Sequence, residues 1–175
     1  MRVQYGEVCI RSAEAADAGQ LAAWWNDGRV MAHAGFPLGL HTSPEAVAEQ
    51  LAGDRDETGR RLILLCRDRP IGEMSYSRRG EETAEIGIKI CERDFQEKGL
   101  GRIALSLLVK ELFAMGFGRI VLDTNRNNTR AQHVYELLGF RKLRVNENSW
   151  TDQLGRPQSS VDYELLPGEL HDFAP

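Results

Sequence analysis

The stretch Ile88-Lys89-Ile90-Cys91-Glu92-Arg93-Asp94-Phe95-Gln96-Glu97-Lys98-Gly99-Leu100-Gly101-Arg102 decides the fold of this chain. It contains an apolar strand, a short polar turn, two glycines one residue apart and the start of a long apolar helix. The first turn of a helix has backbone N–H groups without intrahelical partners and carries the positive end of the helix dipole. Glycine allows an anion to approach these groups closely. From spacing alone, a phosphate site and an ordinary strand-to-helix turn are equally good interpretations.

This glycine turn differs from the two best-known nucleotide-binding loops. No Gly-Lys-Ser/Thr sequence follows it, as a Walker A loop would require. Ala104 occupies the place of the third glycine of the dinucleotide motif.

The composition predicts one globular domain over residues 1–175, with a core at about 8–167. The chain is 42% hydrophobic and 27% charged, which suits a packed core. Its formal net charge of −4 gives no general attraction to nucleic acid or to an anionic membrane surface. No apolar run approaches the ~18 residues of a membrane span, and the first residues lack the apolar core of a signal peptide. We therefore expect a cytoplasmic protein with no nucleic-acid partner and no membrane partner.

The three cysteines, Cys9, Cys66 and Cys91, are odd in number, widely spaced and set in apolar runs. This pattern predicts buried reduced thiols and neither disulfides nor a metal site. Cys91 adjoins the glycine turn, where a nucleophile is conceivable. No partner base can be identified for it, so we prefer a packing role.

Capping residues mark two early helices. Asp17 and Gln20 precede an apolar run and predict an N-cap with its capping-box partner. That helix stops at residues 26–28. A second helix is predicted from Ser43-Pro44, with proline at its first position, to about Gly53.

Between these helices lies a loop, residues 34–41, punctuated by glycine and proline. Loops of this kind often line binding sites. His33 and His41 are candidates for substrate contact, although a lone loop histidine is more often only a solvated polar residue. A connector whose Phe36 and Leu38 cap the core is nearly as good an interpretation of the loop.

The apolar pattern in the middle of the chain, residues 62–91, predicts three strands. Residues 62–66 and 71–77 are expected to form a hairpin, followed by a strand over 83–91. In that strand isoleucines alternate with Glu85, Gly87 and Lys89, so one face is apolar and the other carries a carboxylate, a glycine and an ammonium. A glycine inside a strand often marks a bulge or a close ligand approach, and Gly87 is a candidate for either.

The remaining elements complete an α+β fold with a mixed sheet. A buried helix runs from the glycine turn to Gly116, a strand follows at 120–122, and a further helix begins after Asn128 and is closed by Gly139. Strands at 140–145 and 160–166 are joined by a polar loop that contains Trp150. The chain ends in a loose acidic tail over residues 168–175.

Two stretches show a resemblance to a known family. Residues 96–101 match the Arg/Gln-x-x-Gly-x-Gly/Ala pyrophosphate loop, and residues 128–140 are similar to Asn-x-x-Ala-x-x-x-Tyr-x-x-x-Gly-Phe, with Asn128, Ala131 and Tyr135 at the named positions. Nearly the whole chain resembles the GNAT superfamily of acetyl-CoA-dependent N-acetyltransferases. Residues 24–27, Trp-Trp-Asn-Asp, look like the branch that includes ribosomal-protein N-terminal acetyltransferases, which also holds enzymes acting on small amines. The resemblance implies a central, mostly antiparallel sheet of six to seven strands flanked by about four helices.

The resemblance also implies a cofactor site for acetyl-CoA as co-substrate, with no metal. The pantetheine arm would pair with the strand backbone, and Gly87 would ease its approach. Asn128 and Ala131 match motif positions on the next helix, where Asn128 would contact the cofactor's arm. The implied cofactor-binding residues are Ile88, Lys89, Ile90, Gln96, Glu97, Lys98, Gly99, Leu100, Gly101, Arg102, Asn128, Ala131 and Tyr135.

Acyl transfer to an amine needs a neutral amine, a stabilised oxyanion and a proton for the departing thiolate. The implied oxyanion donor is a backbone N–H around Ile88. Tyr135 matches the position that hydrogen-bonds the leaving sulfur, and its spacing also allows a core tyrosine.

Three carboxylates are candidates for the base. Glu85 is the first choice, because it lies on the polar face of its strand, and an ion pair with Lys89 or another neighbour is an equally good role for it. Asp123 and Glu73 are the next candidates. Proximity of the two substrates can supply much of the rate without a strong base.

We therefore predict an N-acetyltransferase that acts on a small-molecule amine or a peptide N-terminus. The alternative is a non-catalytic acyl-CoA-binding or sensor domain of the same fold. The negative net charge suits a cationic acceptor but locates no acidic pocket. The strands around Phe140 and Val161 form either an edge that pairs with a second subunit in a homodimer or a covered edge.

Overall fold

A computed structural model describes residues 1–175 and contains one eight-stranded sheet with strand order β1-β2-β3-β4-β5-β6-β8-β7. All neighbouring strands are antiparallel except β5 and β6. The strands are β1 (Arg2–Tyr5), β2 (Val8–Ser12), β3 (Gly59–Cys66), β4 (Arg69–Arg79), β5 (Thr83–Ile90), β6 (Arg119–Asn125), β7 (Arg141–Thr151) and β8 (Pro157–Leu165). The helices are α1 (Ala18–Asn26), α2 (Gly28–Met31), α3 (Pro44–Ala52), α4 (Leu100–Ala114) and α5 (Thr129–Leu137).

This architecture confirms the predicted mixed α+β sheet, with one more strand and one more helix than expected. The additional strand, β1, forms because residues 2–5 pair with β2. The additional helix, α2, is a single turn that precedes the 34–41 loop and begins where the Asp27 side chain accepts the Arg29 N–H.

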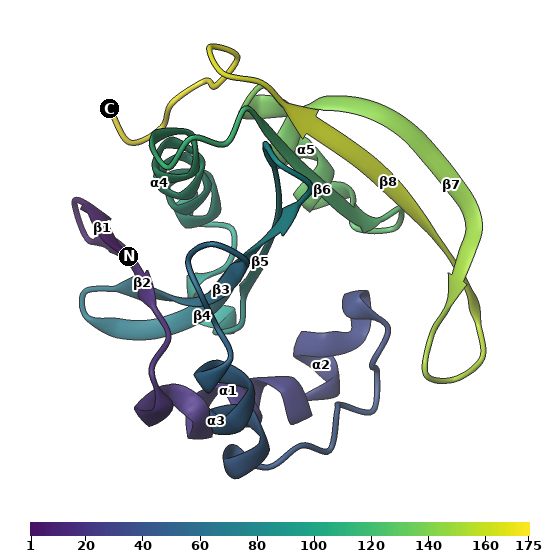
Figure 1. Ribbon diagram of the computed structural model, residues 1–175. Coiled ribbons are helices and arrows are strands. Elements are labelled where there is room, and N and C mark those ends of the chain that lie inside the picture. Colours follow the sequence, from purple (N-terminus) through teal and green to yellow (C-terminus); the bar gives the residue numbers. More distant parts are fainter.

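Helices cover both faces of the sheet, α4 and α5 on one side and α1 to α3 on the other (Figure 1). Alternation along β3 shows why both faces are covered. Leu62 and Leu64 belong to the core beneath α4, whereas Ile63 and Leu65 belong to the core beneath α1 and α3. Because successive strand residues point to opposite faces, this continuous apolar run needs helices on both sides.

The sheet opens in its middle, between β5 and β6. These two strands pair over only three positions, from Thr83↔Arg119 to Glu85↔Val121. Beyond them β5 stays paired with β4 up to Ile90, and β6 stays paired with β8 up to Asn125. The edge of β5 that faces β6 is therefore without a strand partner over residues 86–90.

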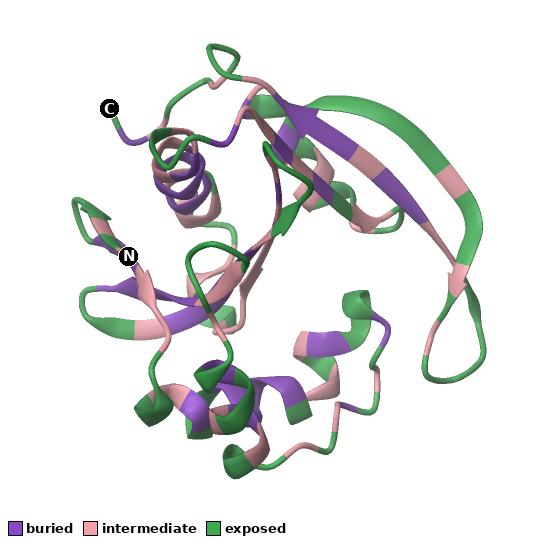
Figure 2. Ribbon diagram, viewed as in Figure 1, coloured by how far each residue is buried: buried purple, intermediate pink, exposed green.

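The β7–β8 hairpin reaches from the sheet to the loop after α2. Trp150 lies inside β7, paired with Gln158, and not in a connecting loop as predicted. At the tip, the Gln153 side chain accepts the Leu38 N–H at 2.9 Å and donates to the Gly39 carbonyl at 3.0 Å. The strand β8 has partners on both sides, so at this end of the sheet the edge strand is β7, which is largely exposed (Figure 2).

The N-cap prediction for α1 is wrong, whereas that for α3 is confirmed. The Asp17 carboxylate binds the Arg11 guanidinium at 2.7 and 2.8 Å and makes no cap hydrogen bond to α1. The same carboxylate also accepts the Glu14 N–H at 2.8 Å, so it closes the preceding 3₁₀ turn and does not cap α1. Ser43 caps α3 as expected by accepting the Ala46 N–H.

The prediction of a loose tail over 168–175 is also wrong. The Phe173 N–H donates to the Ser106 hydroxyl at 3.0 Å, and the Lys110 ammonium pairs with Asp172 at 2.7 Å. Ala174 is buried. These contacts hold the segment along α4 (Figure 1).

The three cysteines are free, as predicted; Cys9 and Cys66 are buried and Cys91 is half-buried. None of the helices combines the length and apolarity that crossing a membrane would need.

Candidate functional site

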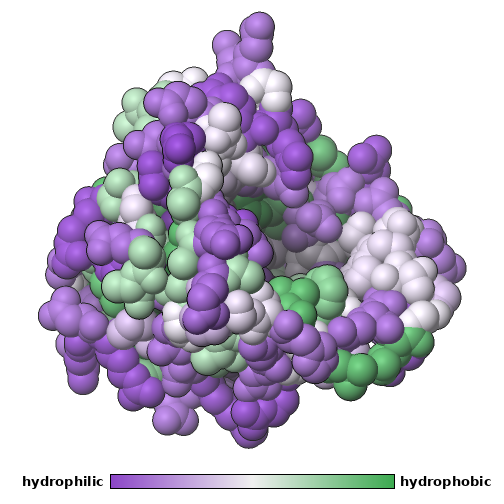
Figure 3. Space-filling view, turned by 60° about the horizontal axis from the view of Figure 1, so that its bottom comes forward, coloured by the Kyte–Doolittle hydropathy of each residue, from purple (hydrophilic) through white to green (hydrophobic).

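A cavity of about 1050 Å³ occupies the opening between β5 and β6. It is visible as the central hollow in Figure 3. Because the strands diverge at this point, the cavity passes through the sheet and has a half on each face. The glycine-loop half is bounded by residues 96–101 and the start of α5, and the tryptophan half by Trp25, α2, His33 and Trp150.

Alternation along β5 assigns its side chains to the two halves. Ile86, Ile88 and Ile90 face the α4 side, where they pack with or beside the core under that helix. Gly87 and Lys89 face the other side, together with Glu73 of the neighbouring strand. The predicted polar face of β5 therefore belongs to the tryptophan half.

The glycine loop leaves donors open at the start of α4. Gly99 is the N-cap residue, has φ 76°, and provides no side-chain cap to the first N–H groups of the helix. A Cβ at this position would lie 3.1 Å from the Nε and Nη2 atoms of Arg102. Open donors at the positive end of a fifteen-residue helix form a suitable site for an anion.

Two side-chain contacts hold this loop in place. The Gln96 amide donates to the Ile90 carbonyl at 2.9 Å, which ties the loop to the end of β5. The Glu97 carboxylate pairs with the Arg130 guanidinium at 2.6 Å, which ties the loop to α5. Of the predicted loop residues, Gln96, Glu97, Gly99, Leu100 and Gly101 line the cavity, whereas Lys98 and Arg102 do not.

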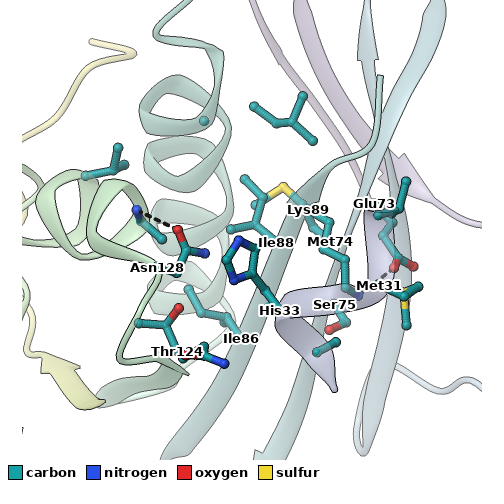
Figure 4. A pocket seen from close by; sticks show the side chains of 18 of the residues that line it. Met31, His33, Glu73, Met74, Ser75, Ile86, Ile88, Lys89, Thr124 and Asn128 are labelled. Atoms are coloured by element: carbon teal, nitrogen blue, oxygen red, sulfur yellow. Dashed lines mark hydrogen bonds and ion pairs between the residues drawn. The ribbon is translucent and has the colours of Figure 1, made fainter. Parts of the chain in front are cut away.

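The start of α5 faces the same space. Asn128 is its N-cap, with the side-chain oxygen accepting the Ala131 N–H at 3.2 Å, and the residue lies at the cavity wall (Figure 4). Ala131 and Tyr135 also line the cavity. The structure thus brings both sequence motifs to one site.

Tyr135 combines a packed ring with an open hydroxyl. The ring lies against Phe140 and Tyr163, with centroids 6.0 and 5.7 Å away. The hydroxyl has no hydrogen-bond partner in the chain, and since no fully buried polar side-chain atom lacks a partner, it is open to the cavity. Burial, and secondly the Asp123 carboxylate, raises the pKa of Tyr135 to about 12. The hydroxyl is therefore a proton donor at neutral pH.

Glu85 is not brought to the cavity. Its carboxylate pairs with the Arg79 guanidinium and lines a smaller neighbouring hollow. The alternative role predicted for Glu85, an ion pair with Lys89 or another neighbour, is confirmed with Arg79 as the partner. Lys89 lies four residues further along the strand and bonds instead to its cross-strand neighbour Glu73.

Glu73 and Asp123 both line the cavity. One oxygen of Glu73 accepts from the Trp25 indole N–H at 2.9 Å and from the Lys89 ammonium at 2.8 Å. Figure 4 shows the contact with Lys89. Asp123 forms no ion pair and lies where the cavity meets the smaller hollow. Asp123 is exposed, and partial desolvation at the cavity wall, followed by the nearby carboxylates of Glu85 and Asp162, raises its pKa.

Several lining residues were not predicted as site residues. Trp25 is notable in the sequence only within the 24–27 stretch that resembles one branch of the family, and Trp150 only as part of a polar loop. Of the two histidines predicted as candidates for substrate contact, His33 lines the cavity and points into it, whereas His41 does not line it (Figure 4). No local pattern distinguishes these residues, because they meet only when the hairpin tip contacts the loop.

Cys91 does not line the cavity. Burial, with Glu73 as the second cause, raises the pKa of its thiol to about 12. A protonated thiol is a poor nucleophile, so the structure supports the packing role.

Comparison with known proteins gives a consistent result. The family model "Acetyltransferase (GNAT) domain" matches residues 7–141. Among curated proteins, the [ribosomal protein bS18]-alanine N-acetyltransferase of Salmonella typhimurium is 32% identical over 68 residues, which cover 39% of this chain and 46% of that protein. The matched part thus spans less than half the length of the curated relative.

Solved structures share the fold over nearly the whole chain. The ribosomal-protein-S5-alanine acetyltransferase from Vibrio fischeri has a TM-score of 0.83 and 18% identity, covering 97% of this chain and 98% of its own. RimL, a ribosomal L7/L12 α-N-protein acetyltransferase in complex with coenzyme A, has a TM-score of 0.83 and 16% identity, covering 95% and 98%.

Proposed function

The chain belongs to the GNAT acetyltransferase family, and from this membership we propose that it transfers the acetyl group of acetyl-CoA directly to a primary amine. The observation that carries the proposal is the cavity that crosses the sheet. It joins an anion site on one face to a separate space on the other, beside an unpaired strand edge. Two substrates can therefore approach each other through the gap from opposite faces. We propose that residues 1–175 act as one domain in this reaction.

The glycine-loop half has features that fit the cofactor. The open N–H groups at Gly99–Gly101 suit a pyrophosphate, and a Cβ at Gly99 would press on the Arg102 side chain beside them, 3.1 Å from its Nε and Nη2 atoms. The unpaired edge at 86–90 suits an amide-containing arm, because amides complete a strand edge by hydrogen bonding. RimL, which shares the fold, was solved with coenzyme A. We assign acetyl-CoA to this half, where it supplies an activated thioester.

Within the cavity we assign an oxyanion donor, a proton donor and a base. A backbone N–H of β5 around Ile88 stabilises the oxyanion, since N–H groups on the unpaired edge have no strand acceptor. Tyr135 donates a proton to the departing thiolate through its open hydroxyl.

For the base we propose Asp123 in place of Glu85. Asp123 faces the cavity without a cationic partner, and its raised pKa brings it closer to the range in which a carboxylate accepts a proton effectively. Glu85 can contribute as a base only indirectly, by acting on Asp123, because both carboxylates line the smaller hollow. Glu73 is already engaged by Lys89 and Trp25.

We propose that the acceptor is a small-molecule amine or a protein N-terminus. The relatives named as ribosomal-protein acetyltransferases favour the N-terminus. We propose a cytoplasmic location, where such an acceptor would be found. A homodimer, if formed, would pair along the exposed edge of β7.

The test is release of free thiol from acetyl-CoA in the presence of a panel of amines and peptides, with calorimetry for CoA and acetyl-CoA in parallel. We expect binding and acceptor-dependent thiol release, with the acetyl group recovered on the amine. Binding without turnover for any acceptor would support the sensor alternative. Absence of both would refute the proposal.

A further inference from the structure

The glycine loop carries cations whose charge is not neutralised. Sixteen of the 22 Lys and Arg residues pair with carboxylates. Of the six that do not, Arg93, Lys98 and Arg102 lie within ten residues around this loop. Half of the cations without an ion pair therefore lie between the 3₁₀ turn at Arg93 and the first turn of α4, a stretch that also holds the unpaired carboxylate of Asp94.

Aromatic rings hold two of these cations in place of acids. The Arg102 guanidinium lies 4.8 Å from the centroid of Phe173, and the Lys98 ammonium lies 5.7 Å from that of Phe95. An aromatic face attracts a cation without cancelling its charge, whereas a carboxylate would cancel it. This arrangement restrains Arg102 and leaves its charge available.

Arg102 is directed at the anion site. Helical side chains lean toward the helix N-terminus. Accordingly, its Nε and Nη2 atoms come within 3.1 Å of where a Cβ of Gly99 would be. Arg102 does not line the cavity itself; its guanidinium lies beside the N-cap residue Gly99, next to the open N–H groups of the first helical turn.

Phe173 is itself fixed by its neighbours along α4. Its backbone N–H donates to the hydroxyl of Ser106, which is fully buried. On one side Asp172 pairs with Lys110, and on the other Ala174 is buried. The ring therefore has a defined place although it is far from Arg102 in sequence.

We propose that Phe173 is a positioning residue for the cofactor: it holds the Arg102 guanidinium, with its charge uncompensated, over the start of α4 to bind the phosphates of acetyl-CoA. This inference rests on the proposed function. It makes the 168–175 segment part of the cofactor site, although neither sequence motif includes it.

The test measures the KM for acetyl-CoA in Phe173→Leu. Losing the ring should raise KM about two- to five-fold, the fold-change equivalent of one cation–π contact, and leave kcat unchanged. Added salt should reduce the difference, because it screens the charge of Arg102. Phe173→Trp should retain the wild-type KM. Leu170→Ala is the matched control, since it alters the same segment without touching Arg102, and it should leave KM unchanged.

A double-mutant cycle separates positioning from a structural role. In an Arg102→Gln background, Phe173→Leu should change KM no further. An unchanged KM in the single variant, or an equal rise in both backgrounds, would overturn the inference. If Phe173→Leu does not fold, a Phe173→Trp variant that loses affinity as much as Arg102→Gln would equally overturn it. Failure of the proposed function is distinct, because wild-type protein would then neither bind CoA nor release thiol.

Discussion

Replacing Tyr135 with phenylalanine isolates the chemistry of one hydroxyl from the packing of its ring. The ring is buried against Phe140 and Tyr163, and phenylalanine keeps those contacts. The hydroxyl has no partner in the chain, so its removal should change the free energy of unfolding by less than about 0.5 kcal/mol. Any large loss of activity must then come from the reaction itself.

The expected loss follows from the role of proton donor. General acid catalysis contributes roughly 10²- to 10⁴-fold, so kcat should fall by at least about 10²-fold, equivalent to about 2.7 kcal/mol in the barrier. The KM for acetyl-CoA should stay nearly constant, because the glycine loop and strand edge are untouched. Thiol release measured at saturating acetyl-CoA and acceptor gives kcat directly.

The pH dependence provides a second readout. Because the pKa of Tyr135 is raised to about 12, the hydroxyl stays protonated as the pH rises and loses its proton only near that value. Wild-type kcat should therefore show no fall attributable to Tyr135 between about pH 7 and 10.

Tyr163→Phe is the matched control. Its hydroxyl bonds to Glu136 at 3.0 Å and does not line the cavity. The control should lose about 1 kcal/mol of stability and little activity. If Tyr135→Phe keeps kcat within about threefold of wild type, or if the two variants lose activity equally, the assignment of Tyr135 as proton donor is refuted.

Three further predictions concern other parts of the chain. Gly99→Val should raise the KM for acetyl-CoA at least about tenfold and cost about 1–2 kcal/mol of stability, because valine strains a residue at φ 76°; wild-type affinity measured by calorimetry would rule out the anion site. Asp123→Asn should lower kcat/KM by about 10²-fold at neutral pH. Wild-type kcat/KM should decline as the pH falls through the raised pKa of Asp123, and the variant should lack this decline. An unaltered pH profile in the variant would exclude Asp123 as the base. The pKa of Asp17 is lowered chiefly by its hydrogen bonds to Arg11, so its contribution to stability is present above the unfolded-state pKa of about 3.9 and is lost as the pH falls through the lower native value. Urea unfolding should therefore show Asp17→Asn about 1–2 kcal/mol less stable than wild type at pH 7, with the gap narrowing toward pH 3; a gap independent of pH would contradict the ion-pair explanation.

Local interactions explain which sequence predictions succeeded. The glycine turn, the Ser43 cap and the α5 motif each depend on residues a few positions apart, and each forms at the predicted place. The Asp17 cap failed because a more distant partner, Arg11, competes for the same carboxylate. The choice of Glu85 rested on strand alternation, which correctly gave its face of the sheet. Alternation does not say which cation a carboxylate meets, and Arg79 holds Glu85 away from the cavity.

By itself, the sequence determined the family, the order of most elements and the half of the site that holds an anion, because glycine geometry, helix starts and strand alternation are local properties. The tertiary structure decided the rest. The opening between β5 and β6 exists because two strands stop pairing after Glu85, and the wall around it exists because Trp150, Trp25 and His33 meet from distant segments. Phe173 likewise reaches Arg102 only through the packing of its segment on α4. Side-chain contacts between distant segments depend on the assembled sheet, and no periodicity in the chain encodes them.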